Sequence, residues 1–406
     1  SYKRFGFLPL DTPILELSEV LLAKAGGETE KQIYRFTRGD DLAMRFDLTV
    51  PLAKYVSKNY GELQFPFRRY QIGKVYRGER PQKGRFREFY QADIDIIGDG
   101  ELSIMNDAEI PSIIYTTFKS LGFDDFTIRI NNRKILNGLF EYLNIVELST
   151  EIMRIIDKLE KIGKENVKLE LLKLNIEEEN VVKILEFISI SGDNEEKIES
   201  LERLNIKNEV FEKGLFELKE VVKYIRLFGV PEENFSIDLT IARGLDYYTG
   251  TVYETFLDNY REIGSVCSGG RYDNLAENYT DKSLPGVGIA IGVTRLFDQL
   301  NDLKLIKIEK ESISDVLIIS TSDDVSECLP IANTFRKEGI NTEVYMNDKK
   351  MKAKFKYADR LKIPYVAIIG EDELKENKVS LKNLVTGKQD TINIQEAVEI
   401  LKEYKK

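Results

Sequence analysis

Histidine is absent from this chain of 406 residues, and its absence excludes several kinds of active site. A Ser-His-Asp triad and a zinc-binding HExxH helix both need an imidazole, and no residue here can supply one as a general base. The two cysteines, Cys267 and Cys328, lie far apart and are expected to be free buried thiols, so no metal site is predicted from the protein's own side chains. Any chemistry must therefore depend on carboxylates, arginines, lysines, tyrosines and bound cations.

Long apolar runs and targeting signals are missing too. No apolar stretch approaches the ~18 residues of a membrane-spanning helix, and the opening SYKRFGFLPL lacks the features of a signal peptide. We therefore expect a cytoplasmic protein with no membrane segment. The net charge of −10 argues against a uniformly basic surface for nucleic acid but permits local basic patches.

The sequence pattern divides the chain into regions. Residues 1–145 mix short strands and helices, among them the helical TVPLAKYVSKNY, which Thr49 can cap. Residues 146–228 carry isoleucine and leucine at helical spacing and are expected to form an inserted helical bundle. Strands then resume over 229–303. After a charged linker near residues 301–313, residues 314–406 alternate as strand, helix, strand, helix, strand, which predicts a separate, largely parallel α/β domain.

The segments PFRRYQIGKVYRG and REFYQADIDIIG indicate a long antiparallel hairpin. Alternate residues of a strand share a face, so arginines of the first strand can meet carboxylates of the second. The residues on this polar face are Arg69, Gln71 and Arg77 on the first strand, and Arg87, Phe89, Gln91, Asp93 and Asp95 on the second. Two interpretations stay open: an exposed sheet face with salt bridges, or a site for a ligand with a planar ring and phosphates.

Three glycine-bordered segments add further polar groups. TIARGLDYYTGTVYE contains Arg243, Tyr247 and Tyr248, and SVCSGGRYDNL is expected to run as a strand, a turn at Gly269–Gly270 and a helix. GVGIAIGVTRLF lacks the dinucleotide-binding spacing but places Arg295 in the first turn of a helix, where it can bind phosphate or pair with an acid. Together with the hairpin, these segments fit a site for ATP and a polar or cationic small molecule.

A dense run of lysines and arginines extends from Lys349 to Lys362 against a single acid, Asp359. It is either a solvated helix face or a contact for a phosphate backbone. Phe355 and Tyr357 among the lysines favour the second interpretation.

Several of these segments resemble a known family. The hairpin FRRYQIGKVYRGERPQKGRFREFYQADIDIIG resembles motif 2 of class II aminoacyl-tRNA synthetases, GVGIAIGVTRLFDQL resembles motif 3, and RFGFLPLDTPILE resembles the end of motif 1. ARGLDYYTGTVYE and SVCSGGRYDNL resemble the two signature peptides of histidyl-tRNA synthetases, and the tail is similar to the anticodon-binding domain of that family. The resemblance covers essentially the whole chain.

This resemblance implies an α+β, class II synthetase-like catalytic domain with an antiparallel sheet, a helical insertion and a C-terminal α/β anticodon-binding domain. The expected boundaries are residues 1–145 and 229–303, residues 146–228, and residues 314–406. The implied assembly is a homodimer. The implied function is ATP-dependent activation of histidine to histidyl-adenylate and transfer to tRNA(His), with ATP as substrate and Mg²⁺ as the metal.

The resemblance also implies a role for individual residues. Arg77 and Arg243 are the implied catalytic contacts to the α-phosphate and the histidine carboxylate. The other implied contacts are Asp47, Thr49 and Gln91 at the amino acid's ammonium; Asp95 and Tyr248 at the imidazole, with Tyr247 lining the pocket; Glu79, Phe89, Arg85 and Arg295 at ATP; and Gln82, Lys352 and Lys356 at tRNA.

A catalytically inactive relative is the main alternative, either a regulatory subunit of histidine biosynthesis or a sensor of uncharged tRNA. The presence of the tail and of Arg77, Arg243 and Arg295 favours the active enzyme. The absence of histidine is explained either by a need to translate the enzyme when charged tRNA(His) is scarce or by drift of composition.

Overall fold

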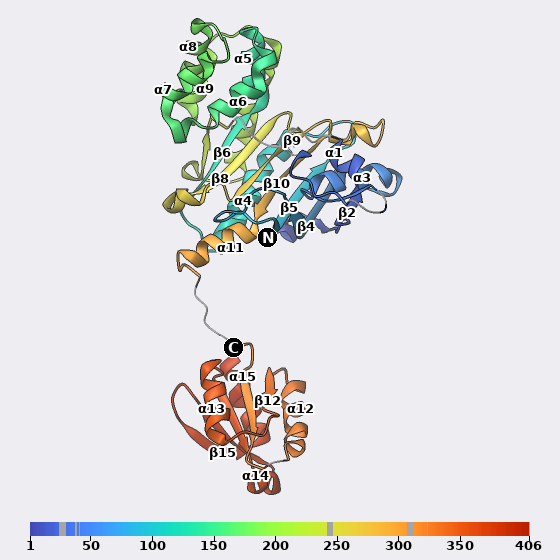
Figure 1. Cartoon of the computed structure of the whole chain (residues 1–406), viewed down its shortest axis with the longest axis vertical. Coiled ribbons are helices and arrows are strands. Elements are labelled where there is room, and N and C mark those ends of the chain that lie inside the picture. The colour runs from blue at the N-terminus through green and yellow to red at the C-terminus, as the bar shows by residue number, and fades with distance from the viewer. Residues whose placement is uncertain are drawn as a thin grey trace. The chain divides into compact units, whose positions relative to one another are not determined.

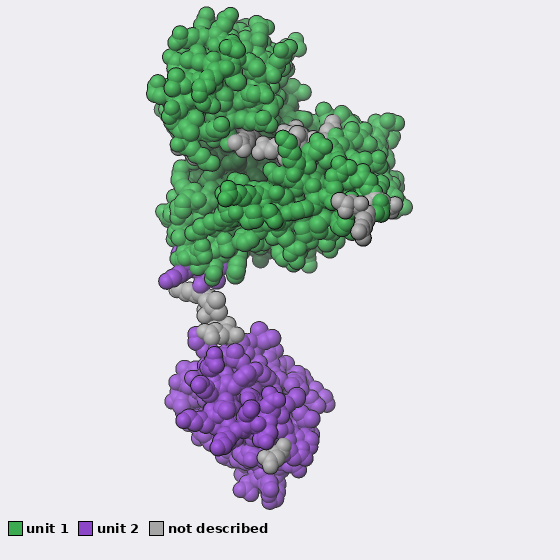
Figure 2. All heavy atoms as spheres, in the orientation of Figure 1, with its two compact units in different colours: residues 1–303 green, residues 304–406 purple. Residues whose placement is uncertain are grey.

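The computed structural model describes residues 1–23, 30–36, 39, 41–241, 247–306, 312–322 and 324–405. The chain divides into two compact units, residues 1–303 and residues 304–406 (Figure 2). No helix in these described ranges is long and apolar enough to cross a membrane.

An eight-stranded sheet forms the centre of unit 1 (Figure 1). Its strands lie in the order β1-β4-β5-β10-β9-β8-β6-β7, and the pairs between β4 and β6 are all antiparallel. The bounds are β1 Leu8–Pro9, β4 Phe67–Tyr76, β5 Glu88–Ile97, β6 Phe126–Asn132, β7 Phe235–Ile237, β8 Thr251–Leu257, β9 Cys267–Tyr272 and β10 Gly286–Gly292, with β2 Leu15–Leu17 and β3 Leu42–Met44 as a separate pair. The predicted antiparallel sheet and its β4–β5 hairpin are confirmed.

The helices of unit 1 include α3, which confirms the helix predicted from TVPLAKYVSKNY. Their bounds are α1 Ser18–Leu22, α3 Thr49–Lys58, α4 Met105–Ser120, α5 Arg133–Tyr142, α6 Ser149–Ile156, α7 Leu159–Leu172, α8 Glu178–Phe187, α9 Asn194–Arg203, α10 Glu209–Leu227 and α11 Val293–Asp302. Helices α5 to α9 form a lobe at one end of the unit (Figure 1).

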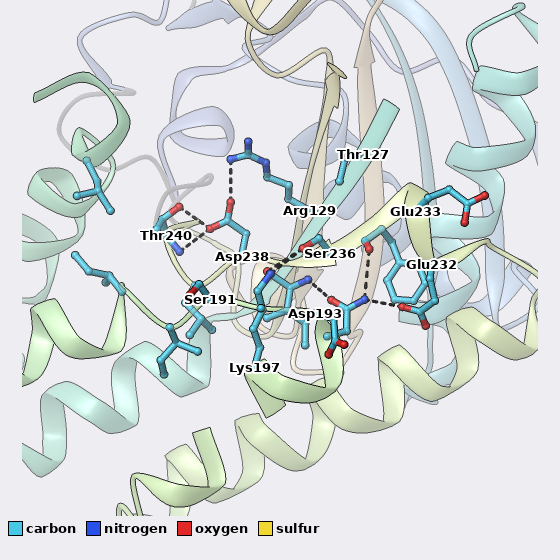
Figure 3. A pocket seen from close by; sticks show the side chains of 18 of the residues that line it. Thr127, Arg129, Ser191, Asp193, Lys197, Glu232, Glu233, Ser236, Asp238 and Thr240 are labelled. Atoms are coloured by element: carbon cyan, nitrogen blue, oxygen red, sulfur yellow. Dashed lines mark hydrogen bonds and ion pairs between the residues drawn. The ribbon is translucent and has the colours of Figure 1, made fainter. Parts of the chain in front are cut away.

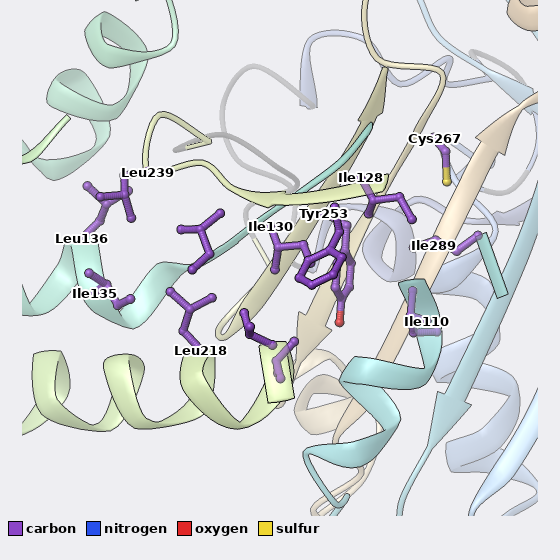
Figure 4. Packing of buried hydrophobic residues seen from close by; sticks show 14 of the residues in the cluster. Ile110, Ile128, Ile130, Ile135, Leu136, Leu218, Leu239, Tyr253, Cys267 and Ile289 are labelled. Carbon is purple, nitrogen blue, oxygen red and sulfur yellow. The ribbon is translucent and has the colours of Figure 1, made fainter. Parts of the chain in front are cut away.

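One face of the sheet is apolar and packs against α4 and α10 (Figure 4). Opposite residues of an antiparallel pair share a face, so Ile289 of β10, Tyr253 of β8 and Ile130 of β6 point to the same side. There they join Ile110 of α4 and Leu218 of α10 in one buried cluster. Burial of each large apolar side chain contributes about 1.5–3 kcal/mol, which makes this face the main source of stability in unit 1.

Helices α5 and α10 cross with their backbones almost in contact. A Cβ atom on Gly138 would lie 2.3 Å from the backbone nitrogen of Phe211, and one on Gly214 would lie 2.7 Å from the backbone nitrogen of Ile135. Because α10 also packs against α4 and β6, this crossing connects the helical lobe to the sheet.

Unit 2 contains a five-stranded sheet in the order β12-β11-β13-β14-β15. The strands are β11 Val316–Ser320, β12 Thr342–Val344, β13 Tyr365–Ile369, β14 Lys378–Asn383 and β15 Gln389–Asn393, and the helices are α12 Leu329–Lys337, α13 Met351–Arg360, α14 Glu371–Glu376 and α15 Ile394–Lys405. Strands β11 to β13 are parallel, as predicted, whereas β14 and β15 add an antiparallel hairpin.

Three local predictions are wrong. Strand β9 runs straight through Gly269 and Gly270 without a turn, because the missing side chain lets β10 approach: a Cβ on Gly269 would lie 2.1 Å from the carbonyl oxygen of Gly288. The segment after β9 forms only a short 3-10 helix, Leu275–Asn278. Thr49 does not cap α3, since it is the first residue of that helix.

We predict that Gly214→Ala destabilises the protein although alanine favours helices. The added methyl group must push α5 and α10 apart, and overpacking of this kind costs about 1–3 kcal/mol. Denaturant-induced unfolding of unit 1, followed by circular dichroism, measures the change. Lys213→Ala, on the exposed side of the same helix, should shift stability by less than about 0.5 kcal/mol. Equal effects of the two variants would contradict the close crossing.

Candidate active site

A cavity of about 460 Å³ lies on the polar face of the sheet, opposite the apolar core. Its lining comes from segments far apart in sequence: Asp47, Thr49, Arg77, Arg85, Gln91, Asp93, Asp95, Asp157, Lys161, Tyr247, Tyr248, Tyr253, Glu254, Phe256, Gly264, Ser265, Ser268, Gly269, Tyr272, Gly288, Ile289, Ala290 and Arg295.

Small residues at the centre of the sheet make room for this cavity. Gly288 of β10 lies opposite Asp95 of β5, and Ala290 lies opposite Asp93. A Cβ on Gly288 would lie only 2.4 Å from Asp95 Oδ1. Larger side chains here would therefore fill the space beside the two carboxylates.

The carboxylate of Asp95 is held by a buried arginine. Arg69 Nη2 lies 2.9 Å from Asp95 Oδ2, across the hairpin register that pairs these residues, and both side chains are almost completely buried. Arg69 Nη2 also donates to the carbonyl oxygen of Leu48 at 2.6 Å. On the other oxygen, Asp95 Oδ1 accepts a hydrogen bond of 2.8 Å from the hydroxyl of Tyr272. Asp95 is thus held in place before any ligand binds, although among the described residues Oδ2 is buried and has only the ion pair and no hydrogen bond.

A second carboxylate enters the cavity from the start of α3. Asp47 Oδ1 accepts hydrogen bonds from the backbone N–H groups of Thr49 and Val50, at 3.2 and 2.9 Å, and this carboxylate rather than Thr49 caps the helix. Asp47 Oδ2 accepts a hydrogen bond of 3.1 Å from the hydroxyl of Tyr247. The tyrosine rings of residues 247 and 248 pack edge to face, with centroids 5.0 Å apart.

Burial raises the pKa of all three carboxylates on this side of the cavity. Desolvation is the largest cause for Asp47, Asp93 and Asp95, and the effect is strongest for Asp93. The positive charge of Arg69 partly offsets the rise for Asp93 and Asp95. Desolvation likewise raises the pKa of Tyr248, so its hydroxyl keeps its proton and can donate a hydrogen bond to a ligand.

Arginines line the part of the cavity where β4 ends and α11 begins, and the charge of Arg77 there acts on the nearby carboxylate of Asp47. Arg77 follows β4, and its guanidinium carbon lies 4.2 Å from the ring centre of Phe46 and 5.2 Å from that of Phe89. Arg295, in the first turn of α11 as predicted, donates to the carbonyl oxygen of Ile263. Burial lowers the pKa of Arg77 and Arg295, but arginine stays protonated at any physiological pH. This part of the cavity therefore suits phosphates or carboxylates.

The structure brings most predicted site residues to this cavity. Nine of them line it: Asp47, Thr49, Arg77, Arg85, Gln91, Asp95, Tyr247, Tyr248 and Arg295. Glu79 is not in the lining but accepts a hydrogen bond of 3.0 Å from Arg85 Nη1, and Phe89 contacts Arg77. Arg243 lies outside the described residues.

The predicted tRNA contacts lie outside the cavity, in two places. Gln82 is exposed in the loop between β4 and β5. Lys352 and Lys356 are exposed on α13 in unit 2, but Lys354 of the same basic run is buried and donates to the carbonyl oxygen of Ser320 at 2.8 Å. Phe355 packs at the margin of a core cluster of that unit.

Sequence reasoning left several lining residues without a role. Asp93 was placed on the polar face of the hairpin, and Tyr272 lay within a quoted signature segment, but neither was assigned to the site. Glu254, Asp157 and Lys161 were not singled out. The alternation of β5 was a sufficient signal for Asp93, whereas Tyr272 depends on β9 continuing past Gly270.

A larger cavity, of about 840 Å³, lies at the β7 edge of the sheet, near β6, β7 and α9 (Figure 3). Its charged groups have partners within the protein: Arg129 Nη1 lies 2.9 Å from Asp238 Oδ2, and Lys197 Nζ donates to Ser236 Oγ and the carbonyl oxygen of Ile237 at 2.9 and 2.7 Å. In the smaller cavity, by contrast, Gln91 Oε1 and Asp93 Oδ1 are buried without a hydrogen-bond partner. We therefore take the smaller cavity as the functional site.

Known protein families and relatives match the chain over most of its length. The model of the family described as histidyl-tRNA synthetase matches residues 1–296, and that described as anticodon binding domain matches residues 315–404. A histidine–tRNA ligase of Clostridium tetani is 61% identical over 404 residues, covering 99% of this chain and 92% of the relative, and one of Finegoldia magna is 51% identical over 98% of this chain and 92% of the relative. A crystal structure of histidyl-tRNA synthetase from Nostoc sp. PCC 7120 superposes with a TM-score of 0.86 at 40% identity, covering 99% of this chain and 93% of that one.

The raised pKa of Asp93 generates a prediction about stability and pH. A carboxyl group that binds its proton more tightly in the folded state makes folding less favourable as pH rises from its ordinary value of 3.8 toward the folded-state pKa. Asp93→Asn removes the free-energy cost of burying an ionised carboxylate. The variant should therefore unfold at a higher temperature than the wild type at pH 8, with a smaller difference near pH 4.

Thermal unfolding of both ligand-free proteins across this pH range checks the prediction. Glu88→Gln, at an exposed carboxylate on the same strand, serves as control: Lys74 lowers the pKa of Glu88, so this variant should not gain stability over the wild type as pH rises. A difference between Asp93→Asn and wild type that is independent of pH would show that Asp93 carries no buried charge.

Proposed function

The chain belongs to the histidyl-tRNA synthetase family, and we propose that its central cavity activates histidine with ATP to histidyl-adenylate, for transfer to tRNA(His). The observation that carries this proposal is the polarity of the cavity. Buried carboxylates gather around Asp95, and arginines gather where β4 ends and α11 begins. A substrate pair that offers both N–H donors and phosphates fits this combination of buried carboxylates and arginines.

In the activation step, an oxygen of the histidine carboxylate bonds to the α-phosphorus of ATP while the bond to the bridging oxygen breaks and pyrophosphate leaves. Negative charge on the α-phosphate needs fixed donors, and we assign this task to Arg77. Its Nε donates to the carbonyl oxygen of Phe46 at 3.4 Å, and its guanidinium packs against two aromatic rings. The guanidinium is thereby oriented in advance of the reaction. Arg243 keeps its proposed role as the second catalytic arginine.

We assign the imidazole of histidine to Asp95 and Tyr248. Neutral imidazole has one N–H donor and one acceptor nitrogen, so a carboxylate and a hydroxyl that stays protonated can satisfy both. Arg69 and Tyr272 hold Asp95 in place. A substrate that lacked either ring nitrogen would leave buried polar groups unpaired, which discriminates strongly against it.

The α-ammonium of histidine is assigned to Asp47, Thr49 and Gln91. The carboxylate of Asp47 is fixed by Tyr247 and by the start of α3, and Gln91 Oε1 is buried without a partner. These groups lie in the same cavity as Asp95.

ATP is assigned to the part of the cavity that the arginines line. In this proposal Glu79 binds the adenine amino group, Phe89 stacks on the base, and Arg85 and Arg295 bind the γ-phosphate. Within the described residues no three acidic or cysteine side chains cluster as a metal cage. Mg²⁺ is therefore assigned to the phosphates of ATP, consistent with its preference for phosphate oxygens and water, and it would neutralise charge on the leaving pyrophosphate.

The proposal for tRNA uses both units. The exposed loop that contains Gln82 reaches the acceptor end, and Lys352 and Lys356 of α13 contact the phosphate backbone in unit 2. We also retain the division of unit 1 into a catalytic domain, residues 1–145 and 229–303, and a helical insertion, residues 146–228. A cytoplasmic location follows from these substrates.

A homodimer is proposed through the segment that resembles motif 1. Four apolar side chains in residues 8–17 are exposed in the single chain, from 39% for Leu17 to 62% for Leu8. Exposed apolar side chains at this density favour an interface.

Nothing in the cavity favours an inactive relative. Arg77 and Arg295 both line it, and the anticodon-binding match extends to residue 404.

The direct test is amino-acid-dependent exchange of pyrophosphate into ATP, run with each of the twenty amino acids. We expect exchange with histidine alone, followed by aminoacylation of tRNA(His). Arg77→Ala should lower kcat/KM by roughly 100- to 1000-fold, the usual cost of removing one oriented donor.

Lys83→Ala, an exposed residue of the β4–β5 loop, provides a matched control and should retain exchange. Folded wild-type protein that supports no exchange with any amino acid would contradict the proposed function.

The dimer is tested by sedimentation. Leu8→Asp should shift the wild-type dimer toward monomer, whereas Phe216→Asp, an exposed apolar residue of α10, should leave it unchanged. A Leu8→Asp variant that dimerises as tightly as the wild type would place the interface elsewhere.

A further inference from the structure

Gln91, Asp93 and Asp95 form a row on one face of β5, and Asp93 is the acid of this row that has no assigned role in the proposed function. It lies between Gln91 and Asp95 on the same face of β5, lines the cavity and is only 2% exposed. Directly across the sheet it faces Gln71 on one side and Ala290 on the other. Its place in the row puts it beneath the space that histidine occupies in the proposed function.

Asp93 Oδ1 is buried and accepts no hydrogen bond. A buried carboxylate oxygen without a donor is costly, and native proteins rarely retain one without a reason. The cost of leaving it unpaired indicates that a donor arrives from outside the protein.

The neighbouring protein groups do not supply that donor. Arg69 Nη2 is bound to Asp95 and to the carbonyl oxygen of Leu48, and its Nη1 donates to Gln71 Oε1 at 3.4 Å. Arg69 Nε is buried and forms no hydrogen bond with Asp93 or any other group of the described residues. Gln71 Nε2, which lies across the ladder, does not reach Asp93, since it too is buried without a partner. Arg69 therefore serves as the counter-ion of Asp95, and Asp93 gains only its longer-range attraction.

We propose that Asp93 is a further specificity-determining residue, whose Oδ1 accepts a hydrogen bond from an N–H group of the bound histidine. This inference rests on the proposed function of the cavity. A charge-assisted hydrogen bond accepted by a carboxylate is roughly twice as strong as a neutral one. Because the donor belongs to histidine, Asp93 contributes to binding of the amino acid and not to binding of ATP. It also favours substrates that carry an ammonium or an imidazole N–H over isosteres without these donors.

The test uses Asp93→Asn and Asp93→Ala in pyrophosphate exchange. The asparagine variant removes the charge but keeps the shape, and the alanine variant removes the acceptor as well. We expect the KM for histidine to rise roughly 10- to 100-fold, more for alanine than for asparagine, while the KM for ATP changes less than about threefold. Asparagine should also leave the fold at least as stable as the wild type at pH 8, which separates weak binding from misfolding.

Two substrate analogues identify the donor. Histidinol keeps both the amino group and the ring, and 3-(imidazol-4-yl)propionate lacks the amino group. If Asp93 accepts from the ring, Asp93→Asn weakens inhibition by both compounds. If it accepts from the ammonium, only inhibition by histidinol weakens.

Glu88→Gln is the matched control, since this exposed carboxylate of the same strand pairs with Lys74 outside the cavity. It should leave both KM values within about twofold of the wild type. A KM for histidine in Asp93→Asn and Asp93→Ala that equals the wild-type value would overturn the inference while leaving the proposed function intact. A wild type without histidine-dependent exchange would instead overturn the function itself.

Discussion

The candidate site depends on the buried guanidinium of Arg69. With none of its side chain exposed, its charge must be matched inside the protein, and Asp95 and the carbonyl oxygen of Leu48 provide the match. A buried ion pair adds little net stability, because both ions lose their water, but removing one partner leaves an uncompensated charge. The pair therefore acts mainly through geometry. A shift of one residue in the pairing of β4 with β5 would separate Arg69 from Asp95 and turn the polar face toward the core. The register of the hairpin and the substrate pocket are therefore specified together.

The same arginine connects parts of the chain that are distant in sequence. Leu48 precedes α3, and the neighbouring Asp47 both caps that helix and enters the cavity. Gathering three carboxylates in one buried space is unfavourable, as the raised pKa of each one indicates. The opposite face of the sheet offsets this cost, because Ile130, Tyr253 and Ile289 bury their side chains against α4 and α10. One sheet thus provides stability on one face and reactivity on the other.

Much of this arrangement could be predicted from sequence where local pattern decides it. The period of two in REFYQADIDIIG placed Gln91, Asp93 and Asp95 on one face, and helical spacing identified the helices of residues 149–227. The predictions were wrong or incomplete where contacts with a segment distant in sequence determine the local structure. Gly269 and Gly270 look like a turn, but Gly269 allows close approach of β10, and Gly270 allows close approach of Thr251 and Tyr248. Lys354 looks like a surface cation within a basic run, but its ammonium reaches the carbonyl oxygen of Ser320. The role of Tyr272 depends on a partner 177 residues away, which no local pattern records.

The central claim is that Arg69 organises a pocket for histidine. Calorimetric titration of histidine into the wild type and into Arg69→Met tests it most directly, because methionine preserves much of the buried volume and removes the charge. We expect binding of one histidine per chain in the wild type. We also expect loss of binding in Arg69→Met, with circular dichroism showing that the variant remains folded. A folded Arg69→Met protein that binds histidine as tightly as the wild type would contradict the account.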